Sequence, residues 1–311
     1  MHKPSVLITG ASGFIGTHLI RFFLKHGYEV IALSRQQRES SYGLTWVTDF
    51  EQIPNTHIDY VVNLAGESVG KGRWTPKRKQ QLLESRVQTT TALYHYLMQA
   101  KIMPETIISG SAVGYYGIDP SLTWQQVCTE DSPSQSIFMA ELCQKWEYSA
   151  LQFSQFNTKI IRLGVVFGKR GGILPQMLLP IKLGLVGKIG NGQQPVVWVH
   201  IHDVLRAIEF LLRTPTQARI FNLVAPTLTH QVDFSIQAAQ LFKKRPFLNA
   251  PAWLFNTLMG EQAQLILNGQ FVAPKNLTQA GFVFHFQGLE HALSNLSQGK
   301  TRRPAVTDPQ D

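Results

Sequence analysis

The feature that most constrains the fold lies near the start of the chain, where glycines follow a short apolar run. Gly10, Gly13 and Gly16 form a G-x-x-G-x-x-G pattern between an expected strand at 6–9 and an amphipathic helix at 17–26. A glycine turn between a strand and a helix exposes N–H groups that can hold the pyrophosphate of a dinucleotide. We therefore expect a dinucleotide-binding βαβ unit; the alternative is a purely structural turn.

Each glycine of this run has its own expected role. Gly10 permits the tight turn, Gly13 lets the backbone approach a pyrophosphate, and Gly16 lets the helix pack close to the strand. The residues of the run that we expect to contact the cofactor are Gly10, Ser12, Gly13, Phe14, Ile15 and Gly16.

The end of the second expected strand, at 30–33, predicts which dinucleotide is bound. A site that prefers NAD places Asp or Glu there to bind the ribose 2′-hydroxyl. This chain has Ser34 and Arg35 at that point. The guanidinium of Arg35 suits a 2′-phosphate, and the Ser34 hydroxyl can add a hydrogen bond. We predict NADP(H) rather than NAD(H); the alternative is an ordinary exposed arginine in a loop.

Strand and helix patterns alternate through the first half of the chain. We expect strands at 6–9, 30–33, 44–47, 60–64, 106–109 and 159–167, and helices at 17–26, 76–99 and 138–153. This alternation is typical of βαβ units, whose parallel sheet is covered on both faces. The predicted fold is α/β, a doubly wound parallel sheet of the Rossmann type, with a smaller C-terminal α+β domain on the substrate side.

The pattern changes after Gly168, where further glycines interrupt the chain before strand and helix patterns return at 196–212 and 220–224. We expect the Rossmann domain to comprise residues 1–170 and 200–225. Residues 171–199 and 226–296 would form the smaller substrate-side domain. Residues 297–311 combine Gly, Pro and charges with little apolar content, which predicts a disordered tail.

Composition excludes several classes of protein. Hydrophobic residues make up 44% of the 311 residues and charged residues 16%, which excludes a disordered chain. The most apolar stretches are far shorter than the ~20 residues that a membrane span needs. Nothing suggests secretion, so we expect a cytoplasmic protein with free thiols at Cys128 and Cys143.

The net charge of +9 raises nucleic acid as a partner. The basic clusters are short and far apart in the sequence, at 77–79, 243–245 and 302–303. Clusters of this length are usually solvated surface, and an anionic small ligand accounts for part of the charge. Nucleic-acid binding is therefore disfavoured.

Four motifs together resemble the extended short-chain dehydrogenase/reductase superfamily of nucleotide-sugar epimerases and dehydratases. They are the glycine run at 10–16, Asn63–Gly66, Ser109–Ala112 and His200–Asp203. The chain is further similar to an atypical branch, the YfcH-type NAD-dependent epimerase/dehydratase family proteins, also described as SulA-like. The segments that carry this likeness are Asn63–Glu67, Arg73–Thr75 with Lys79, Ser85-Arg86, Gly114–Gly117, Thr129–Pro133, Trp146-Glu147, Arg162–Gly168, Gly171-Gly172 and, for the C-terminal extension domain, Gly260–Gly269 and Pro274–Phe282.

The resemblance implies further cofactor contacts. It places Asn63, Leu64, Ala65 and Gly66 beside the adenosine ribose. It also implies Glu67 at the border of the cleft, Arg86 facing the cofactor from the long helix, and Val165 near the nicotinamide.

The catalytic pattern of the superfamily is broken in this chain. The superfamily uses a tyrosine and a lysine four residues later, because the lysine lowers the tyrosine pKa from roughly 10. The corresponding positions hold Phe138 and Leu142. The substitutes we expect are Ser111 to orient a substrate carbonyl, and Glu141 or a phenol (Tyr116 or its neighbour Tyr115) to move a proton. For each, a purely structural role is the alternative.

The sequence favours no metal site. His200, His202 and Asp203 lie close together, but no third ligand accompanies the histidines in a recognisable pattern. We expect Trp198 and His200 to line the substrate cleft instead, with Arg73 and Trp74 at its rim.

The function we infer is an NADP(H)-dependent oxidoreductase or epimerase-like enzyme that acts on a small organic substrate, such as a sugar derivative. The alternative is a catalytically inactive NADP(H)-binding regulatory protein. The identity of the substrate, and the choice between a monomer and a homodimer, stay open at this point.

Overall fold

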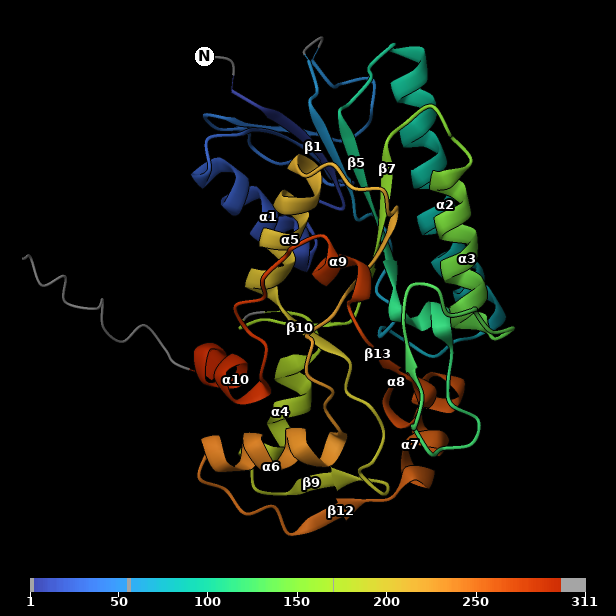
Figure 1. Cartoon of the computed structure of the whole chain (residues 1–311), viewed down its shortest axis with the longest axis vertical. Coiled ribbons are helices and arrows are strands. Elements are labelled where there is room, and N and C mark those ends of the chain that lie inside the picture. Colours follow the sequence, from blue (N-terminus) through green and yellow to red (C-terminus); the bar gives the residue numbers. More distant parts are fainter. Residues whose placement is uncertain (1–2, 55–56, 170, 298–311) are drawn as a thin grey trace, which may run out of the picture.

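The computed structural model describes residues 3–54, 57–169 and 171–297. Its largest element is a seven-stranded sheet in the upper half of the molecule (Figure 1). The strands are β1 (Ser5–Thr9), β2 (Glu29–Leu33), β3 (Leu44–Val47), β4 (Tyr60–Asn63), β5 (Thr106–Ala112), β7 (Thr158–Leu163) and β11 (Ile220–Leu223). They lie in the order β11-β7-β5-β4-β1-β2-β3, and every neighbouring pair is parallel. The prediction of a doubly wound Rossmann sheet is confirmed.

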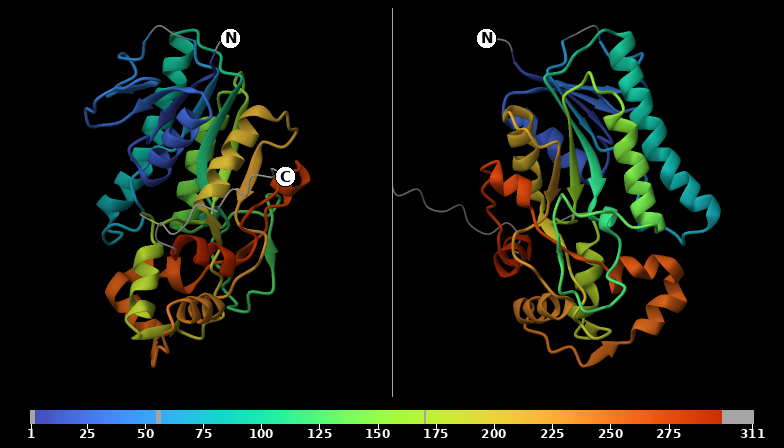
Figure 2. Two further views of the ribbon diagram at one scale, coloured as in Figure 1. Left: turned by 90° about the vertical axis from the view of Figure 1, so that its left-hand side faces the viewer. Right: turned by 45° about the vertical axis from the view of Figure 1, so that its right-hand side comes forward.

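Helices cover both faces of the sheet because successive strand residues point to opposite sides. Val6 and Ile8 of β1 pack with α1 (Phe14–Lys25) and α5 (Ile201–Arg213). Leu7, between them, belongs to the opposite core, which includes residues of α2 (Pro76–Gln99) and α3 (Phe138–Leu151). The two views of Figure 2 show these helix pairs on either side of the sheet.

The stretch predicted as one strand at 159–167 is two strands. After β7 the chain turns at Gly164, where an added Cβ would lie 2.8 Å from the carbonyl oxygen of Val197. The next strand, β8 (Val165–Phe167), pairs with β10 (Trp198–His200) outside the main sheet. Apolar content alone did not reveal this break, since apolar residues occur on both sides of it.

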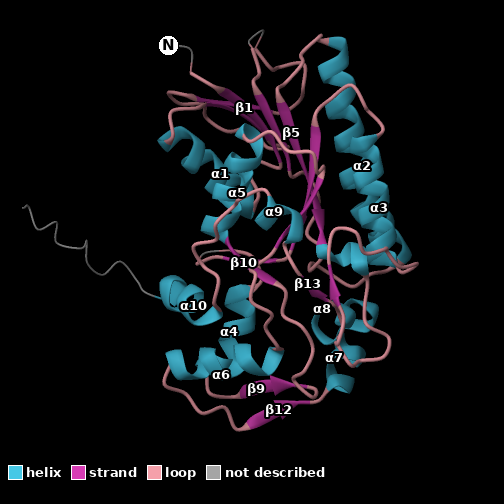
Figure 3. Cartoon of the chain, viewed as in Figure 1, coloured by secondary structure: helices cyan, strands magenta, loops and turns pink. Residues whose placement is uncertain are grey.

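The remaining elements are short helices and two-stranded sheets, most of them in the lower half of the molecule (Figure 3). They are η1 (Val113–Tyr116), β6 (Val127–Cys128), α4 (Leu174–Lys182), β9 (Val186–Ile189), α6 (Gln231–Leu241), β12 (Leu248–Ala250), α7 (Ala252–Met259), η2 (Gly260–Ala263), α8 (Gln264–Leu267), β13 (Phe271–Val272), α9 (Lys275–Gln279) and α10 (Leu289–Ser297). Of the expected disordered tail, Ser297 ends α10, and residues 298–311 lie outside the described residues.

Three further expectations can be compared with the structure. Trp198 is buried, stacks on Phe167 and donates its indole N–H to Thr229, so it is a core residue and does not line a cleft. Cys128 and Cys143 are both free, as expected, and the structure places both in buried positions. Among the described residues, no helix is long and apolar enough to cross a bilayer.

Candidate functional site

The predicted cofactor residues gather where the strand order reverses. In a doubly wound sheet, ligands bind beyond the carboxyl ends of the strands at this switch point. Here the switch lies between β1 and β4, which are neighbours in the sheet and send the chain in opposite directions. The glycine run follows β1, and the segment 64–67 follows β4, so these two predicted contact segments are adjacent.

The turn after β1 requires its glycines. Gly10 has a φ of +66°, and a Cβ on it would lie 2.6 Å from the carbonyl oxygen of Leu64. A Cβ on Gly16 would lie 2.4 Å from the carbonyl oxygen of Gly10. The roles expected for Gly10 and Gly16, a tight turn and a close approach of helix to strand, agree with this geometry.

Asn63 joins the strand ends and is itself closed to solvent. Its amide donates to Thr90 of α2 and to Ser109 of β5, while Thr9 of β1 donates to its oxygen. The Asn63 side chain therefore links the carboxyl end of β4 to β1, β5 and α2. Any contact with a cofactor would have to come from the Asn63 backbone or from neighbouring residues.

The start of α1 is open. Gly13 is the N-cap and brings no capping side chain, and the described first turn contains no acidic residue. Ser12 and Gly13 are exposed, whereas the Phe14 ring is closely covered by a glycine-rich segment; an added Cβ at Gly168 or Gly171 would lie 2.4 Å from that ring. Free N–H groups at a helix start, with the positive end of the helix dipole, suit a phosphate group.

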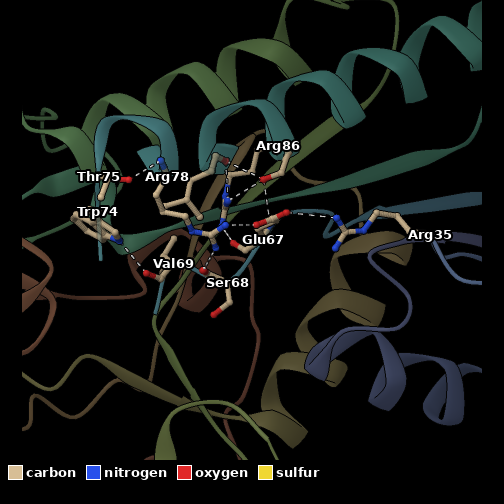
Figure 4. Close-up of polar contacts among 10 residues, drawn as sticks. Arg35, Glu67, Ser68, Val69, Trp74, Thr75, Arg78 and Arg86 are labelled. Carbon is tan, nitrogen blue, oxygen red and sulfur yellow. Dashed lines mark hydrogen bonds and ion pairs between the residues drawn. The ribbon is translucent and has the colours of Figure 1, made fainter. Parts of the chain in front are cut away.

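Three arginines surround Glu67, just beyond β4 (Figure 4). Arg78 of α2 donates to the Glu67 carboxylate and to the carbonyl oxygen of Ser68. Arg35, after β2, approaches the other carboxylate oxygen at 3.4 Å. Arg86 donates to the backbone oxygen of Glu67 at 2.8 Å. The sequence did not reveal this convergence, because the three arginines are far apart along the chain.

This group of side chains carries an excess of positive charge. Hydrogen bonding from Arg78 lowers the pKa of Glu67, so its carboxylate is ionised. Burial lowers the pKa of Arg86 to about 10, which leaves its guanidinium charged at neutral pH. The buried Nε atoms of Arg78 and Arg86 have no hydrogen-bond partner among the described residues. Two guanidinium groups on one carboxylate, with a third on the backbone oxygen of the same residue, leave a net positive charge that favours an anion.

The surroundings of Arg35 differ from the expectation in one respect. No carboxylate follows β2, but the loop after β4 brings Glu67 to Arg35. The Arg35 side chain is 89% exposed and its contact with Glu67 is long, so it can turn to another partner. Ser34 is buried, and its hydroxyl accepts a hydrogen bond from the backbone N–H of Gln36.

The end of β5 holds a buried polar network. Ser111 donates its hydroxyl proton to Glu147 of α3 at 2.6 Å. Arg162 of β7 donates two hydrogen bonds of 2.8 Å to the same carboxylate. Burial by itself lowers the pKa of Arg162, but its hydrogen bonds to Glu147 and the charge of that residue raise it above the ordinary value. Sequence reasoning missed Glu147 as a partner of Ser111, since the Trp146-Glu147 motif gave no indication of where the side chain points.

The Tyr116 hydroxyl is not exposed, so a substrate cannot reach it in this structure. It is completely buried, its hydroxyl donates to Asn222 at 2.7 Å, and it accepts from Arg162. Burial raises the pKa of Tyr116 to about 12. The expectation for this residue is corrected, because its hydroxyl is fully used inside the network. The ring of Tyr115 lies flat against Arg162, 3.4 Å from its guanidinium carbon.

Helix α3 carries the residues at the expected tyrosine and lysine positions. Phe138 and Leu142 pack with Trp74 in a small apolar cluster, which confirms that these positions are apolar contacts in the fold. Glu141 is exposed in the first turn of α3. The structure therefore brings Ser111 together with Glu147, and it does not bring Ser111 together with Glu141 or the Tyr116 hydroxyl. Val165 lies half-buried in β8, beside Trp198.

In the structure, His285 joins His202 and Asp203 near α5, and His200 is not part of this group. Ligand atoms of His202, Asp203 and His285 lie within 4.8 Å of one another. The Asp203 carboxylate, however, accepts from the backbone N–H groups of His285 and Phe286 and from Arg206. Its oxygens anchor the segment before α10 onto α5, and the adjacent guanidinium disfavours a cation.

Comparison with known proteins places these features in a family. The model of the NAD dependent epimerase/dehydratase family matches residues 6–223, and residues 250–296 match a domain of unknown function, DUF1731. An epimerase family protein of Staphylococcus aureus (strain N315) is 34% identical over 93% of this chain and 98% of its own length. A similar relative in Staphylococcus saprophyticus is also 34% identical, over 93% of this chain and 98% of its own.

Solved structures agree with this placement. The human epimerase family protein SDR39U1 (isoform 2), determined with NADPH, is 30% identical, with a TM-score of 0.84 over 94% of this chain and 98% of its own. A nucleoside-diphosphate sugar epimerase from Corynebacterium glutamicum is 27% identical, with a TM-score of 0.73 over 94% of this chain and 58% of its own. This chain belongs to the NAD dependent epimerase/dehydratase family, in an extended short-chain dehydrogenase/reductase form that carries a C-terminal DUF1731 domain.

Proposed function

We propose that this protein is an NADP(H)-dependent oxidoreductase or epimerase-like enzyme that acts on a small organic substrate, such as a sugar derivative. The observation that carries the proposal is the convergence of Arg35, Arg78 and Arg86 beside the open start of α1. The human relative SDR39U1, whose structure was determined with NADPH, supports the same cofactor.

The residues present fit a dinucleotide with a 2′-phosphate. The pyrophosphate would rest on the N–H groups of residue 12 and of residues 14–16; the N–H of Gly13 already donates to the carbonyl oxygen of Gly10. Arg35 would turn from Glu67 to the 2′-phosphate, since a phosphate offers a guanidinium more acceptors than one carboxylate oxygen at 3.4 Å. The ion pair between Glu67 and the half-buried Arg78 would remain when Arg35 turns away from Glu67.

We further propose that Ser111 and Glu147 take over proton transfer from the missing tyrosine and lysine. A bound nicotinamide would supply the hydride donor or acceptor. When a substrate alcohol is oxidised, Ser111 would take the proton of its hydroxyl and pass its own proton to Glu147 across the 2.6 Å hydrogen bond. Ser111 is 2% exposed, so the side chains around it must move for substrate to enter. Glu141, exposed nearby on α3, is the second candidate proton carrier.

The cofactor part is tested by fluorescence titration of the purified protein with NADPH and with NADH. We expect Arg35→Ala to weaken NADPH binding by roughly tenfold or more, since a charged hydrogen bond contributes about 1.5–3 kcal/mol. NADH binding should change little. Arg38→Ala is the matched control, because Arg38 is exposed in the same loop and stacks on Trp46. Equal loss of NADH and NADPH binding in Arg35→Ala would contradict a 2′-phosphate role.

The catalytic part is tested in a screen of nucleotide sugars and small ketones. Ser111→Ala should remove turnover by at least about a hundredfold while NADPH binding persists, in line with general acid–base contributions. Glu141→Gln is the comparison variant. If Glu141→Gln abolishes turnover and Ser111→Ala does not, the assignment of Ser111 and Glu147 is wrong.

A second candidate function is an NADP(H)-binding regulator without turnover. The apolar packing of Phe138 and Leu142 against Trp74, and the burial of Ser111, favour it. Tight NADPH binding without oxidation of bound NADPH by any compound of the screen would support this alternative over the enzyme.

A further inference from the structure

One part of the chain has a strongly unbalanced charge that the cofactor site does not use. Within residues 171–199 and 226–260, Asp233 is the sole acidic residue. The basic residues of the same two segments are Lys182, Lys188, Lys243, Lys244 and Arg245. The proposed function does not account for the basic cluster at 243–245.

The fold brings two of these basic segments together. The chain leaving α4 runs beside the loop between α6 and β12: the backbone N–H of Leu248 donates to the carbonyl oxygen of Leu185 at 3.0 Å. An added Cβ on Gly184 would lie 3.9 Å from the Lys244 side chain, and one on Gly187 would lie 3.2 Å from Pro246. Residues 182–187 and 243–248 therefore form one continuous surface.

Large apolar side chains are exposed on this surface. Leu183, Leu185 and Leu248 are 61%, 43% and 48% exposed, and Phe247 is 73% exposed. Contiguous exposed apolar side chains on a soluble protein mark an interaction site, whereas single ones need no explanation. We name this surface the end patch; it comprises Lys182, Leu183, Leu185, Lys243, Lys244, Arg245, Phe247 and Leu248.

The end patch lies away from the cofactor residues. Strands β9 and β12 occupy the lower end of the long axis of the molecule, opposite the half that holds the seven-stranded sheet (Figures 1 and 2). Asp233 does not neutralise the patch, because it caps the first turn of α6 while Lys243 follows the last. Lys243 is ten positions after Asp233, which at the rise of a helix corresponds to about 15 Å. The positive charge at this end is therefore uncompensated by the nearest acid in the sequence.

We propose that the end patch binds the surface of a membrane that contains anionic phospholipids. Phe247 and the leucines would enter the boundary between headgroups and acyl chains, while the lysines and Arg245 keep their charges among the lipid phosphates. The combination of apolar and basic side chains at one exposed end is the observation that selects this partner. A nucleic acid would use the charges and leave the leucines and Phe247 without a contact.

The test uses the full chain and sedimentation with lipid vesicles. Vesicles of phosphatidylcholine alone are compared with vesicles of equal parts phosphatidylcholine and phosphatidylglycerol, at low and at high salt. We expect binding to the mixed vesicles only, and weaker binding at high salt. Each basic residue near an anionic surface contributes about fivefold in affinity, so the variant with Lys243→Ser, Lys244→Ser and Arg245→Ser should bind at least about tenfold more weakly.

Matched variants separate the patch from general charge and apolarity. Arg21→Ser, Lys101→Ser and Lys145→Ser remove as many exposed basic residues from the sheet half of the molecule. Leu183→Ser with Phe247→Ser is compared with Met98→Ser and Met103→Ser, two exposed methionines elsewhere. Only the patch variants should lose vesicle binding, and all variants should keep NADPH binding, which shows that they are folded.

Three outcomes would overturn the proposal. The first is no binding to either kind of vesicle. The second is equal loss of binding in the patch variants and their controls. The third is binding of double-stranded DNA, lost in the 243–245 variant, by a protein that leaves the vesicles in solution; this would assign the patch to nucleic acid. None of these results bears on whether NADPH binds, so the proposal can fail independently of the proposed function.

Discussion

The candidate site has two parts with opposite construction. We call residues 12–16 and 34–35 the cofactor end, and the network of Ser111, Glu147 and Arg162 the chemistry end. At the cofactor end, the start of α1 has no side-chain cap and Arg35 is almost fully exposed. At the chemistry end, Ser111, Glu147 and Arg162 bind one another in a buried network. Polar groups left open indicate a ligand, whereas polar groups paired with one another indicate stability and fixed positions.

The largest effect should follow from breaking the paired network. In Arg162→Met the Glu147 carboxylate stays buried without its cation, so we expect a loss of about 3–5 kcal/mol in the free energy of unfolding. Urea denaturation measures this loss. Arg35→Ala, the matched variant at the open end, should change stability by less than about 0.5 kcal/mol. Similar losses in both variants would remove the contrast between the two ends.

His200 sharpens the comparison because it is buried outside both ends and its Nε2 atom has no partner among the described residues. Burial lowers the pKa of His200 to about 4, below its value of roughly 6.5 in an unfolded chain. A neutral buried histidine stabilises the fold fully above pH 6.5, and this contribution is lost as the pH falls towards 4.

Over that range the wild type should lose about 3 kcal/mol through His200, at about 1.4 kcal/mol per pH unit. His200→Gln should flatten this part of the stability profile, measured by urea denaturation between pH 4 and 7. His95→Gln, at an exposed position on α2, is the control. A profile of His200→Gln that is as steep as that of the wild type would show that His200 is protonated in the fold, or bound to another group.

Gly16→Ala tests the close packing under the open end. The new Cβ would lie 2.4 Å from the carbonyl oxygen of Gly10, and backbone cannot move away cheaply. We expect a loss of about 1–3 kcal/mol in stability together with weaker NADPH binding, because the turn that presents the N–H groups must shift. Gly288→Ala, where nothing lies within 4 Å of the new Cβ, should leave both unchanged. NADPH binding by Gly16→Ala at the affinity of the wild type would contradict this account of the turn.

The smallest effect should come from Glu67→Gln. Its ion pairs with Arg35 and Arg78 are partly exposed, so stability should change by less than about 1 kcal/mol. NADPH affinity should rise by a few fold, since one negative charge near the phosphates is removed. Glu51→Gln, exposed elsewhere, is the control for the titration. A marked fall in NADPH affinity would mean that Glu67 positions Arg35 for the phosphate.

The glycine turn after β1 and the helix α2 could be predicted from the sequence because their signals are local. Gly10, Gly13 and Gly16 stand in one short run, and the bounds of α2 follow from Pro76 and the periodic pattern after it. The chemistry end could not be predicted, because its contacts join residues that are distant in sequence. Glu147 of α3 binds Arg162 of β7 and Ser111 of β5, which are three different elements. The same holds for Glu67 and Arg35, which are 32 positions apart.

Tyr116 shows why residue type alone misleads. A tyrosine after a strand end resembles an exposed phenol, yet this one is buried and bound to Asn222, 106 positions away. The break at Gly164 is a similar case, since the chain there lies against the carbonyl oxygen of Val197, which comes from a later part of the sequence. Both errors arise from tertiary contacts that no local pattern encodes.

The contrast between the two ends is tested most directly by hydrogen–deuterium exchange of backbone amides with and without NADPH. We predict slower exchange at residues 12–16 and 34–36 on binding, and unchanged exchange in β7, which carries Arg162 of the paired network, and in its neighbour β11. Protection confined to the network, with none at residues 12–16, would contradict the assignment of the open end as the cofactor site.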